Sequence, residues 1–491
     1  MPDYDVIVAG AGNAALAASV SARLAGAERV LVLEKAPEEL RGGNTHYSGG
    51  LLRLAFDGLP QILRLVPQAS DLPGFIEGVE AYPADSFWSD LHRMTAGRTD
   101  PELGEILISR SYDTACWMAA QGIRFEPAIS LGAVRVGNLI KWPKGAIVRA
   151  ANEGVGLSRM WFAAAQRCGI EIRYNSGVTQ LLQDGTGRVI GVEVRDASGL
   201  HQVTAKAIVL GCGGFEANVA WRAQYLGRPW DHAKVRGTMF NQGDGLRMAL
   251  AIGAMPWGQW SGCHATPINA AAPAYGDRKL TDKTNRLSYL YGMMLNRLGL
   301  RFVDEGEDQA LFTYAKFGGA ILNQPGGVAW QIFDAKVTHL LEPRYATSEP
   351  FRADTLDALI GQIDLDRTTA LKTLAEFNAA AGHGIFNPGD RDHMATSGLA
   401  LPKSNWAQRL DTPPFIAYPV TGGITFSFGG LKITENAQVV ATDWQPIAGL
   451  FTCGEMVGGL FHSNYPGGSG LMSGAVFGRI AGSSAARAAL S

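Results

Sequence analysis

The sequence predicts an α/β fold in which a sheet of mostly parallel strands is interrupted by a second lobe of α+β character. Three observations support this. The first 35 residues read as an apolar strand, a glycine turn, an Ala-rich helix and a second apolar strand. Apolar strands that end in glycine return twice further along the chain. Residues 264–405 do not continue this pattern of apolar strands and glycine turns, so we expect a separate cap lobe there. The cap would lie between the two parts of one domain, 1–263 and 406–491.

Composition and charge are those of a globular enzyme with more than one lobe. The chain has 491 residues, 46% hydrophobic and 18% charged, and its net charge of −2 gives no basic footprint for nucleic acid. No apolar run reaches the roughly 20 residues that cross a bilayer. The N-terminal residues enter a strand pattern without a basic segment. We therefore expect a cytoplasmic protein with no transmembrane segment.

The cysteines indicate no metal site. There are five, and none forms a C-x-x-C pair. This argues against zinc, an iron–sulfur cluster and a disulfide framework.

The first glycine turn predicts dinucleotide binding. Gly10 allows a tight turn, Gly12 lets the backbone approach a pyrophosphate, and Ala15 lets the helix pack close to the sheet. Glu34 ends the second strand, 22 residues after Gly12, where an acid bonds a ribose hydroxyl. Strand, helix and acid together make the interpretation more specific than the glycines alone.

The segment after the second strand favours FAD over NAD. Residues 41–53, "RGGNTHYSGGLLR", add two more Gly-Gly pairs, which suit a long ligand that returns along the same surface. Asp244 opens a helix after Gly243, either as a cap or as a partner of a polyol chain. Near the end, residues 462–478, "HSNYPGGSGLMSGAVFG", place bare backbone before a helix, an arrangement typical of close ligand approach.

Taken in order, these motifs resemble a known flavoprotein family. The set G10AGNAA, Glu34, G42GNT, G211CGG, G243DG, R301FVDE, G429GL, C453GE and the closing glycine turn is similar to fumarate reductases, succinate dehydrogenases and 3-ketosteroid Δ1-dehydrogenases. Within that family the sequences of these motifs look most like those of the tricarballylate dehydrogenases. The resemblance implies a Rossmann-like FAD-binding domain with a mobile cap. It also implies oxidation of a CH–CH bond next to a carboxylate or carbonyl, with the hydride passing to flavin N5.

The resemblance also assigns the cofactor positions. We expect FAD to contact Gly10, Gly12, Asn13, Ala14, Ala15, Glu34, Lys35, Arg41, Gly42, Gly43, Asn44, Thr45, Ser48, Gly49, Gly50, Val178, Gly211, Gly213, Gly214, Asn241, Gly243, Asp244, Gly454, Glu455, Gly468, Ser469, Gly470, Leu471 and Ser473. The succinate dehydrogenases attach FAD covalently through a His in this region. His46 falls three residues past that position, so we expect non-covalent FAD.

The chain departs from the fumarate reductases at the substrate positions. Thr425 and Phe426 stand in place of a His–His pair, and Tyr465 stands in place of a carboxylate-binding Arg. Tyr314 and Lys316 align with the Arg and Lys of the proton-carrying segment. We therefore discount fumarate reduction while keeping the fold.

The resemblance to ketosteroid dehydrogenases implies roles for the two tyrosines. Tyr314 would be the base, and Tyr465 would hold a substrate oxygen together with a backbone N–H near Ser469. A tyrosine base needs a nearby cation to lower its pKa, for which Lys316 or Arg301 are candidates. His264 matches the family's substrate-binding His. We expect Thr425, Ser427 and Asn464 to face the substrate as well.

Four functions stay open. The first is dehydrogenation of a di- or tricarboxylate of the tricarballylate kind, and the second is desaturation of a cyclic ketone or keto acid. A fumarate-reductase-type reductase and a non-catalytic flavin electron carrier are the others, and a large cap argues against the carrier. Because no haem or iron–sulfur motif is present, electrons would leave to O₂, a quinone or a separate partner protein.

Overall fold

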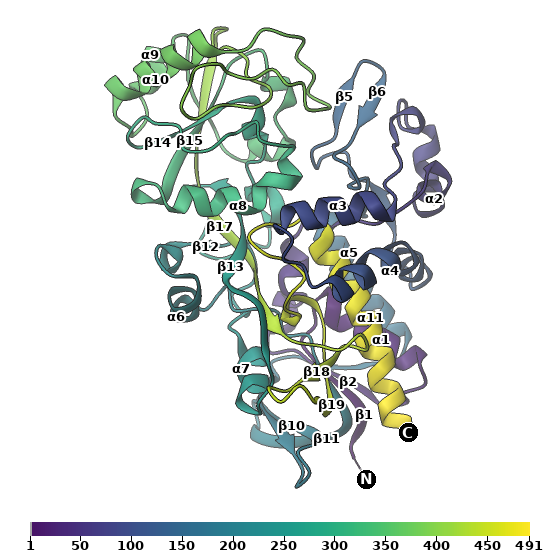
Figure 1. Ribbon diagram of the computed structural model, residues 1–491. Coiled ribbons are helices and arrows are strands. Elements are labelled where there is room, and N and C mark those ends of the chain that lie inside the picture. Colours follow the sequence, from purple (N-terminus) through teal and green to yellow (C-terminus); the bar gives the residue numbers. More distant parts are fainter. Residues whose placement is uncertain (1) are drawn as a thin grey trace.

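The computed structural model describes residues 2–491. Its main sheet confirms the predicted α/β fold (Figure 1). The strand order is β18-β19-β11-β1-β2-β8, with parallel pairing except between β18 and β19. These strands are β1 (Tyr4–Ala9), β2 (Val30–Leu33), β8 (Glu171–Arg173), β11 (Gly199–Leu210), β18 (Gln438–Val440) and β19 (Pro446–Thr452). Their Val, Ile and Leu side chains are largely buried because helices and a second layer cover both faces.

Two helices from opposite ends of the chain pack against each other beside this sheet. They are α1 (Asn13–Leu24) and α11 (Ser469–Leu490), which lie side by side in Figure 1. Small residues let them approach, because a Cβ on Gly478 or Gly482 would collide with the carbonyl oxygens of Ala14 or Ala18. The contact brings the first and last glycine turns of the chain to the same place.

The sequence "QDGTG" at residues 183–187 predicts the turn of a hairpin, and the structure has this hairpin. Strands β9 (Gly177–Gln183) and β10 (Val189–Asp196) pair antiparallel on either side of it, and β10 also pairs with β11. Asp184 accepts hydrogen bonds from the N–H groups of Thr186 and Arg188, which closes the turn.

The region between the first glycine turns and residue 168 is mainly helical, with short strands. It contains α2 (Leu59–Leu65), α3 (Ala84–Met94), α4 (Pro101–Ala120) and α5 (Glu153–Arg167), with β3 (Leu51–Leu52), β4 (Phe125–Pro127), β5 (Val134–Val136), β6 (Leu139–Lys141) and β7 (Val148–Ala150). Two further helices, α6 (Val219–Trp221) and α7 (Asp244–Ala251), follow β11.

The second lobe has its own antiparallel sheet and core. The long strands β13 (Pro256–Asn269) and β17 (Phe415–Leu431) pair and run from the main sheet into the upper lobe (Figure 1). Around them lie β14 (Met293–Asn296), β15 (Val328–Phe333), β16 (Phe351–Ala353), α8 (Ala310–Leu322), α9 (Leu356–Ile360) and α10 (Arg367–Ala380). The short strand β12 (Lys234–Val235) pairs parallel with β17 below these elements, near α6 (Figure 1). Met293, Ile332 and Phe377 belong to a core separate from that of the main sheet.

Two details of this lobe refine the expectations. The Asp/Thr/Ala/Leu-rich sequence of residues 353–382 predicts one helical run, but it forms two helices, because Gly361 closes α9 and the Asp366 side chain caps α10. The predicted domain boundary after residue 263 falls inside β13, which is continuous. The division into domains stays a prediction. None of the helices in residues 2–491 has the length and apolar composition needed to span a bilayer.

Candidate functional site

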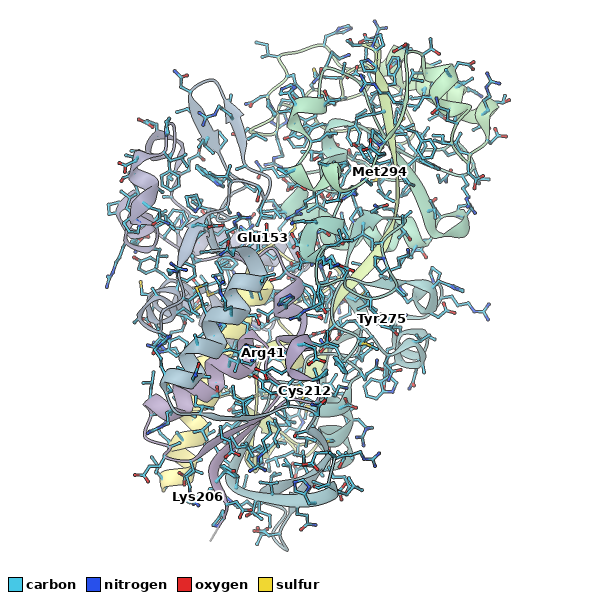
Figure 2. All side chains as sticks on the ribbon, turned by 180° about the vertical axis from the view of Figure 1, so that it is seen from behind. Arg41, Glu153, Lys206, Cys212, Tyr275 and Met294 are labelled. Atoms are coloured by element: carbon cyan, nitrogen blue, oxygen red, sulfur yellow. The ribbon has the colours of Figure 1, made fainter. Side chains whose placement is uncertain are left out.

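A long cavity follows the glycine turns and ends where α8 meets the closing turn. Glu34 and Lys35 line one end, and Leu311, Tyr314 and Tyr465 line the other. Cys212, at the carboxyl end of β11, lines the cavity and lies near the middle of the molecule in Figure 2. The carboxyl edge of a parallel sheet is where such folds bind ligands.

The first glycine turn has the shape that a pyrophosphate needs. Gly10 has φ +101°, and a Cβ there would collide with the carbonyl oxygen of Gly211, so the fold itself requires glycine. Gly12 caps α1, and a Cβ there would meet no atom closer than the Thr45 hydroxyl at 3.5 Å. The space beside Gly12 therefore belongs to the cavity, at a helix N-terminus that favours an anion.

Two acidic side chains, Glu34 and Asp244, line the cavity beyond this turn. Glu34 is buried at the end of β2, accepts a hydrogen bond from the Ala36 N–H at 2.8 Å, and has a pKa raised by burial. Asp244, at the start of α7, pairs with Lys35 across the cavity wall. These positions suit the hydroxyl groups of a ribose and a polyol chain.

Two carboxyl groups lie together beneath the middle of the cavity. The amides of Asn44 and Asn241 donate to Glu216 Oε1 at 2.6 and 2.5 Å, and the N–H of Ser427 donates to Glu455 at 2.7 Å. Burial raises the pKa of Glu216, and burial together with Glu216 raises the pKa of Glu455 well above its usual range. The pair thus favours holding a proton between its members.

The closing turn is fixed to α8 by side-chain and backbone hydrogen bonds. Asn464 donates to the Phe312 carbonyl at 2.7 Å, and the Gly467 N–H donates to the Leu311 carbonyl at 2.9 Å. Gly468, with φ +91°, then caps α11. This turn positions Tyr465 against α8, next to Tyr314.

Tyr314 and Tyr465 share a hydrogen bond between their hydroxyl groups on the cavity wall. Burial raises the pKa of both hydroxyls above the usual value of 10, most strongly for Tyr314. Arg236 acts in the opposite direction on both. The pair can hold a substrate oxygen and exchange a proton.

His264 lies behind the tyrosines rather than on the cavity surface. Its ring stacks on Phe426 at 5.2 Å and meets the rings of Tyr314 and Tyr465 edge-on at 4.7 and 5.0 Å. It is fully buried, and neither ring nitrogen has a hydrogen-bond partner in residues 2–491. Burial holds its pKa well below the usual range, so the ring is neutral.

Four charged side chains line the same part of the cavity. Arg236 and Arg344 both pair with Asp282, at 2.6 and 2.5 Å, and Glu342 lies 3.5 Å from Arg344. Arg236 also donates to the Thr425 hydroxyl at 3.0 Å. This cluster faces the end of the cavity that holds the tyrosines.

Comparison with known proteins identifies the family of this flavin-shaped site. The sequence pattern of the FAD binding domain family matches residues 5–471. The chain belongs to the FAD binding domain family.

Relatives within this family include both kinds of enzyme that the motifs indicated. A probable fumarate reductase of Shewanella frigidimarina (strain NCIMB 400) is 30% identical over 492 residues, covering 99% of this chain and 75% of that protein. The 4-oxocyclohex-2-ene-1-carboxylate 5-dehydrogenase of Sinomonas cyclohexanicum is 26% identical over 573 residues, covering 99% and 94%. The predicted family and an FAD-dependent oxidoreductase activity are confirmed.

A solved structure shares the fold. The 3-ketosteroid Δ1-dehydrogenase of Sterolibacterium denitrificans has a TM-score of 0.75 at 21% identity, and the match covers 99% of each chain. This similarity supports the fold alone.

Most of the expected FAD positions lie on the cavity. These are Gly10, Gly12, Asn13, Ala14, Glu34, Lys35, Gly43, Asn44, Thr45, Ser48, Gly49, Gly50, Val178, Gly211, Gly213, Asn241, Asp244, Gly454, Glu455, Gly468, Gly470, Leu471 and Ser473. Ala15, Arg41, Gly42, Gly214, Gly243 and Ser469 lie outside its lining. Ala15 packs against Gly211 instead, and Arg41 bonds Tyr174.

The expected substrate positions divide in the same way. Tyr314, Tyr465, Thr425 and Ser427 line the cavity, whereas His264 and Asn464 support it from behind. Lys316 points out of the cavity and pairs with Glu307 at 2.6 Å. Arg301 pairs with Glu305 in the cap lobe. Neither cation reaches the tyrosines, so we drop both as partners of Tyr314.

The sequence did not reveal the charged groups that lie near the tyrosines instead of Lys316 and Arg301. Arg236, Asp282 and the pair Glu342 and Arg344 come from three separate segments with no motif spacing, and Glu216 follows its glycine turn without a known pattern. A signal existed for Glu216 alone, since it directly follows "GCGGF" at a strand end.

Proposed function

We propose that this protein is an FAD-dependent dehydrogenase that oxidises a CH–CH bond next to a carboxylate or carbonyl of a small substrate, in the manner of tricarballylate dehydrogenase. The observation that carries the proposal is the hydrogen-bonded pair Tyr314–Tyr465 at the end of the cavity, beside a buried cation, Arg236. A carrier of electrons needs no such hydroxyl pair.

The chain's own residues account for the proton half of the reaction. The Tyr465 O–H donates a hydrogen bond to the substrate oxygen and so acidifies the neighbouring C–H. Tyr314 takes that proton, and Arg236 favours its phenolate form against the effect of burial. Bound FAD would supply the acceptor for the hydride from the adjacent carbon.

His264 and Phe426 serve this pair by position. The His264 ring stacks on Phe426 and contacts the rings of both tyrosines. Because the imidazole is neutral, it adds no charge that would compete for the proton. The site excludes water because Tyr314 and Tyr465 are only 7% and 6% exposed.

We also propose that FAD is held without a covalent bond. His46 is buried on the segment Gly43–Tyr47, where it packs edge-on against Tyr47 and lies outside the cavity lining. Burial and Arg278 lower the pKa of its ring to about 4. Heating the yellow protein in denaturant should release all its flavin. Flavin that stays with the precipitated chain would contradict this.

A cyclic keto acid is the second candidate substrate. It is favoured by Tyr465, which suits a ketone oxygen and stands where fumarate reductases have Arg. A similar enzyme is named for such a compound. Reduction in the fumarate reductase direction is the less favoured alternative. The electron acceptor would be O₂, a quinone or a separate protein.

Anaerobic titration of the FAD-loaded protein tests the proposal. Tricarballylate or 4-oxocyclohexane-1-carboxylate should bleach the oxidised flavin, and O₂ or an artificial acceptor should restore it. If neither compound bleaches the flavin at millimolar concentration, both substrate classes are wrong.

A further inference from the structure

The charged cluster at the cavity joins the two lobes and is almost entirely buried. Arg236 follows β12, whereas Asp282 and Arg344 lie in the 3-10 helices Thr281–Thr284 and Pro343–Thr347 of the upper lobe. The side chains of Arg236, Asp282 and Arg344 are 8%, 4% and 8% exposed. A buried charge of this kind needs a partner, since transfer from water is costly.

The internal pairing leaves one cation incompletely satisfied. Asp282 serves both guanidinium groups, and Arg236 has further acceptors in Thr425 and the Tyr47 carbonyl. In Arg344, Nη1 has no hydrogen-bond partner among the described residues, and the Glu342 carboxyl oxygen 3.5 Å away is also unpartnered. Burial raises the pKa of Glu342, which weakens its value as the missing counter-charge.

The cluster therefore places two guanidinium groups on the cavity wall, and one of them, Arg344, keeps an N–H donor that is unpartnered within residues 2–491. The two guanidinium groups of Arg236 and Arg344 share the carboxylate of Asp282. The planar guanidinium matches a carboxylate with two parallel hydrogen bonds. A carboxylate entering here would complete the hydrogen bonding of Arg344.

We propose that Arg344, with Arg236 beside it, binds a substrate carboxylate that is separate from the group held by Tyr314 and Tyr465. This rests on the proposed function and narrows it to substrates with two polar ends. One end is a remote carboxylate at the arginines. The other is the carboxyl or carbonyl group whose neighbouring C–H loses its proton to Tyr314. Di- and tricarboxylic acids and keto acids qualify, whereas a plain ketone lacks the remote anion.

Both ends lie along one continuous wall. Arg236 donates to Thr425, the next residue Phe426 stacks on His264, and that ring contacts both tyrosines. The arginines also act electrostatically on the tyrosines, because Arg236 opposes the rise in the pKa of each hydroxyl. A substrate that spans this wall meets the cations and the hydroxyls at once.

The test measures binding to dithionite-reduced, FAD-loaded protein by calorimetry, so that no turnover occurs. The probes are tricarballylate, 4-oxocyclohexane-1-carboxylate and cyclohexanone. Arg344→Gln should weaken both acids about 100-fold and leave cyclohexanone unchanged, because the lost hydrogen bonds are charge-assisted. Arg344→Lys should restore part of the loss, since it keeps the charge without the planar geometry.

The design separates a loss of carboxylate binding from a loss of fold stability. Arg344→Gln leaves Asp282 paired with Arg236 but removes the guanidinium 3.5 Å from Glu342, so the melting temperature of each variant is measured beside its affinities. Arg297→Gln removes an exposed arginine of the same lobe that pairs with Asp364, and it should change no affinity. A purely structural role for Arg344 would lower the melting temperature and leave the ratio of acid to ketone affinity unchanged, which would overturn the inference.

The two proposals can fail separately. Acid binding that depends on Arg344, without bleaching of the oxidised flavin by any probe, supports the carboxylate site and contradicts the proposed function. Bleaching by acids that bind Arg344→Gln as tightly as the unaltered protein supports the function and contradicts the carboxylate site.

Discussion

At the scale of single residues, the Tyr314–Tyr465 pair accounts for the chemistry. Replacing Tyr314 by Phe removes the proposed base while keeping the ring that packs on His264. We expect kcat to fall by about 10²–10⁴ with FAD still bound, the range typical of losing general acid–base catalysis. Stopped-flow flavin reduction measures this directly.

Tyr289→Phe is the matched control for that substitution. Tyr289 is also fully buried, and its hydroxyl bonds Thr313, but it does not line the cavity. It should retain turnover. Unchanged turnover in Tyr314→Phe would remove Tyr314 as the base.

The raised pKa of Tyr314 sets the pH dependence. A base whose pKa lies above 10 is protonated at neutral pH, and each unit of pH raises its active fraction tenfold. The value of kcat/KM for substrate oxidation should therefore rise about tenfold per pH unit from pH 7 to the alkaline limit of stability. A profile that is flat over this range would show that another group takes the proton.

At the scale of elements, the turn between β1 and α1 contains two glycines with different roles. The fold requires Gly10, whereas Gly12 leaves space for the ligand. Gly12→Ala should leave the unfolding temperature of the FAD-free protein unchanged and weaken FAD binding, because its Cβ enters the cavity. Gly12→Val should lose FAD altogether. Gly10→Ala should instead destabilise the protein by about 1–3 kcal/mol, because φ is +101° and the Cβ meets backbone. A fully yellow Gly12→Val protein would contradict the pyrophosphate assignment.

The carboxyl pair beneath β11 and β17 should make stability depend on pH. Because the folded-state pKa values of Glu216 and Glu455 are raised, their contribution is full below about pH 4.5 and is lost as pH rises through the raised values. Urea unfolding of the FAD-free protein should show lower stability at pH 8 than at pH 5. Glu455→Gln should reduce that difference, because the amide keeps the hydrogen bonds without the charge. An equal difference in both proteins would show that the pair titrates outside this range.

Local patterns predicted most of the elements and the cofactor end of the site. The strand–turn–helix at Gly10 and Gly12 and the hairpin at Asp184 depend on neighbouring residues, so the sequence alone reveals them. The break between α9 and α10 was missed because the Asp366 cap lies within an otherwise helical composition. Alignment with the family motifs put Tyr314 and Tyr465 on the cavity. Lys316 points away from it because residues two apart on the helix α8 do not share a face.

At the scale of the whole molecule, the substrate end depends on contacts between distant segments. Arg236 meets Asp282 across the junction of the two lobes, and Asp282 also pairs with Arg344, at sequence separations of 46 and 62 residues. No spacing rule within one element predicts such a cluster, because the fold of both lobes creates it. The same junction brings α8 against the closing turn and so pairs the two tyrosines.

The central claim is that the two lobes enclose an FAD-dependent oxidation of a CH–CH bond. Mass spectrometry of the substrate after one anaerobic turnover tests it most directly, with flavin absorbance followed in the same sample. The account predicts that each mole of flavin bleached by tricarballylate or the keto acid yields one mole of product lighter by two hydrogen atoms, with a new carbon–carbon double bond. Bleaching without loss of hydrogen from carbon, or no bleaching by either compound, would contradict it.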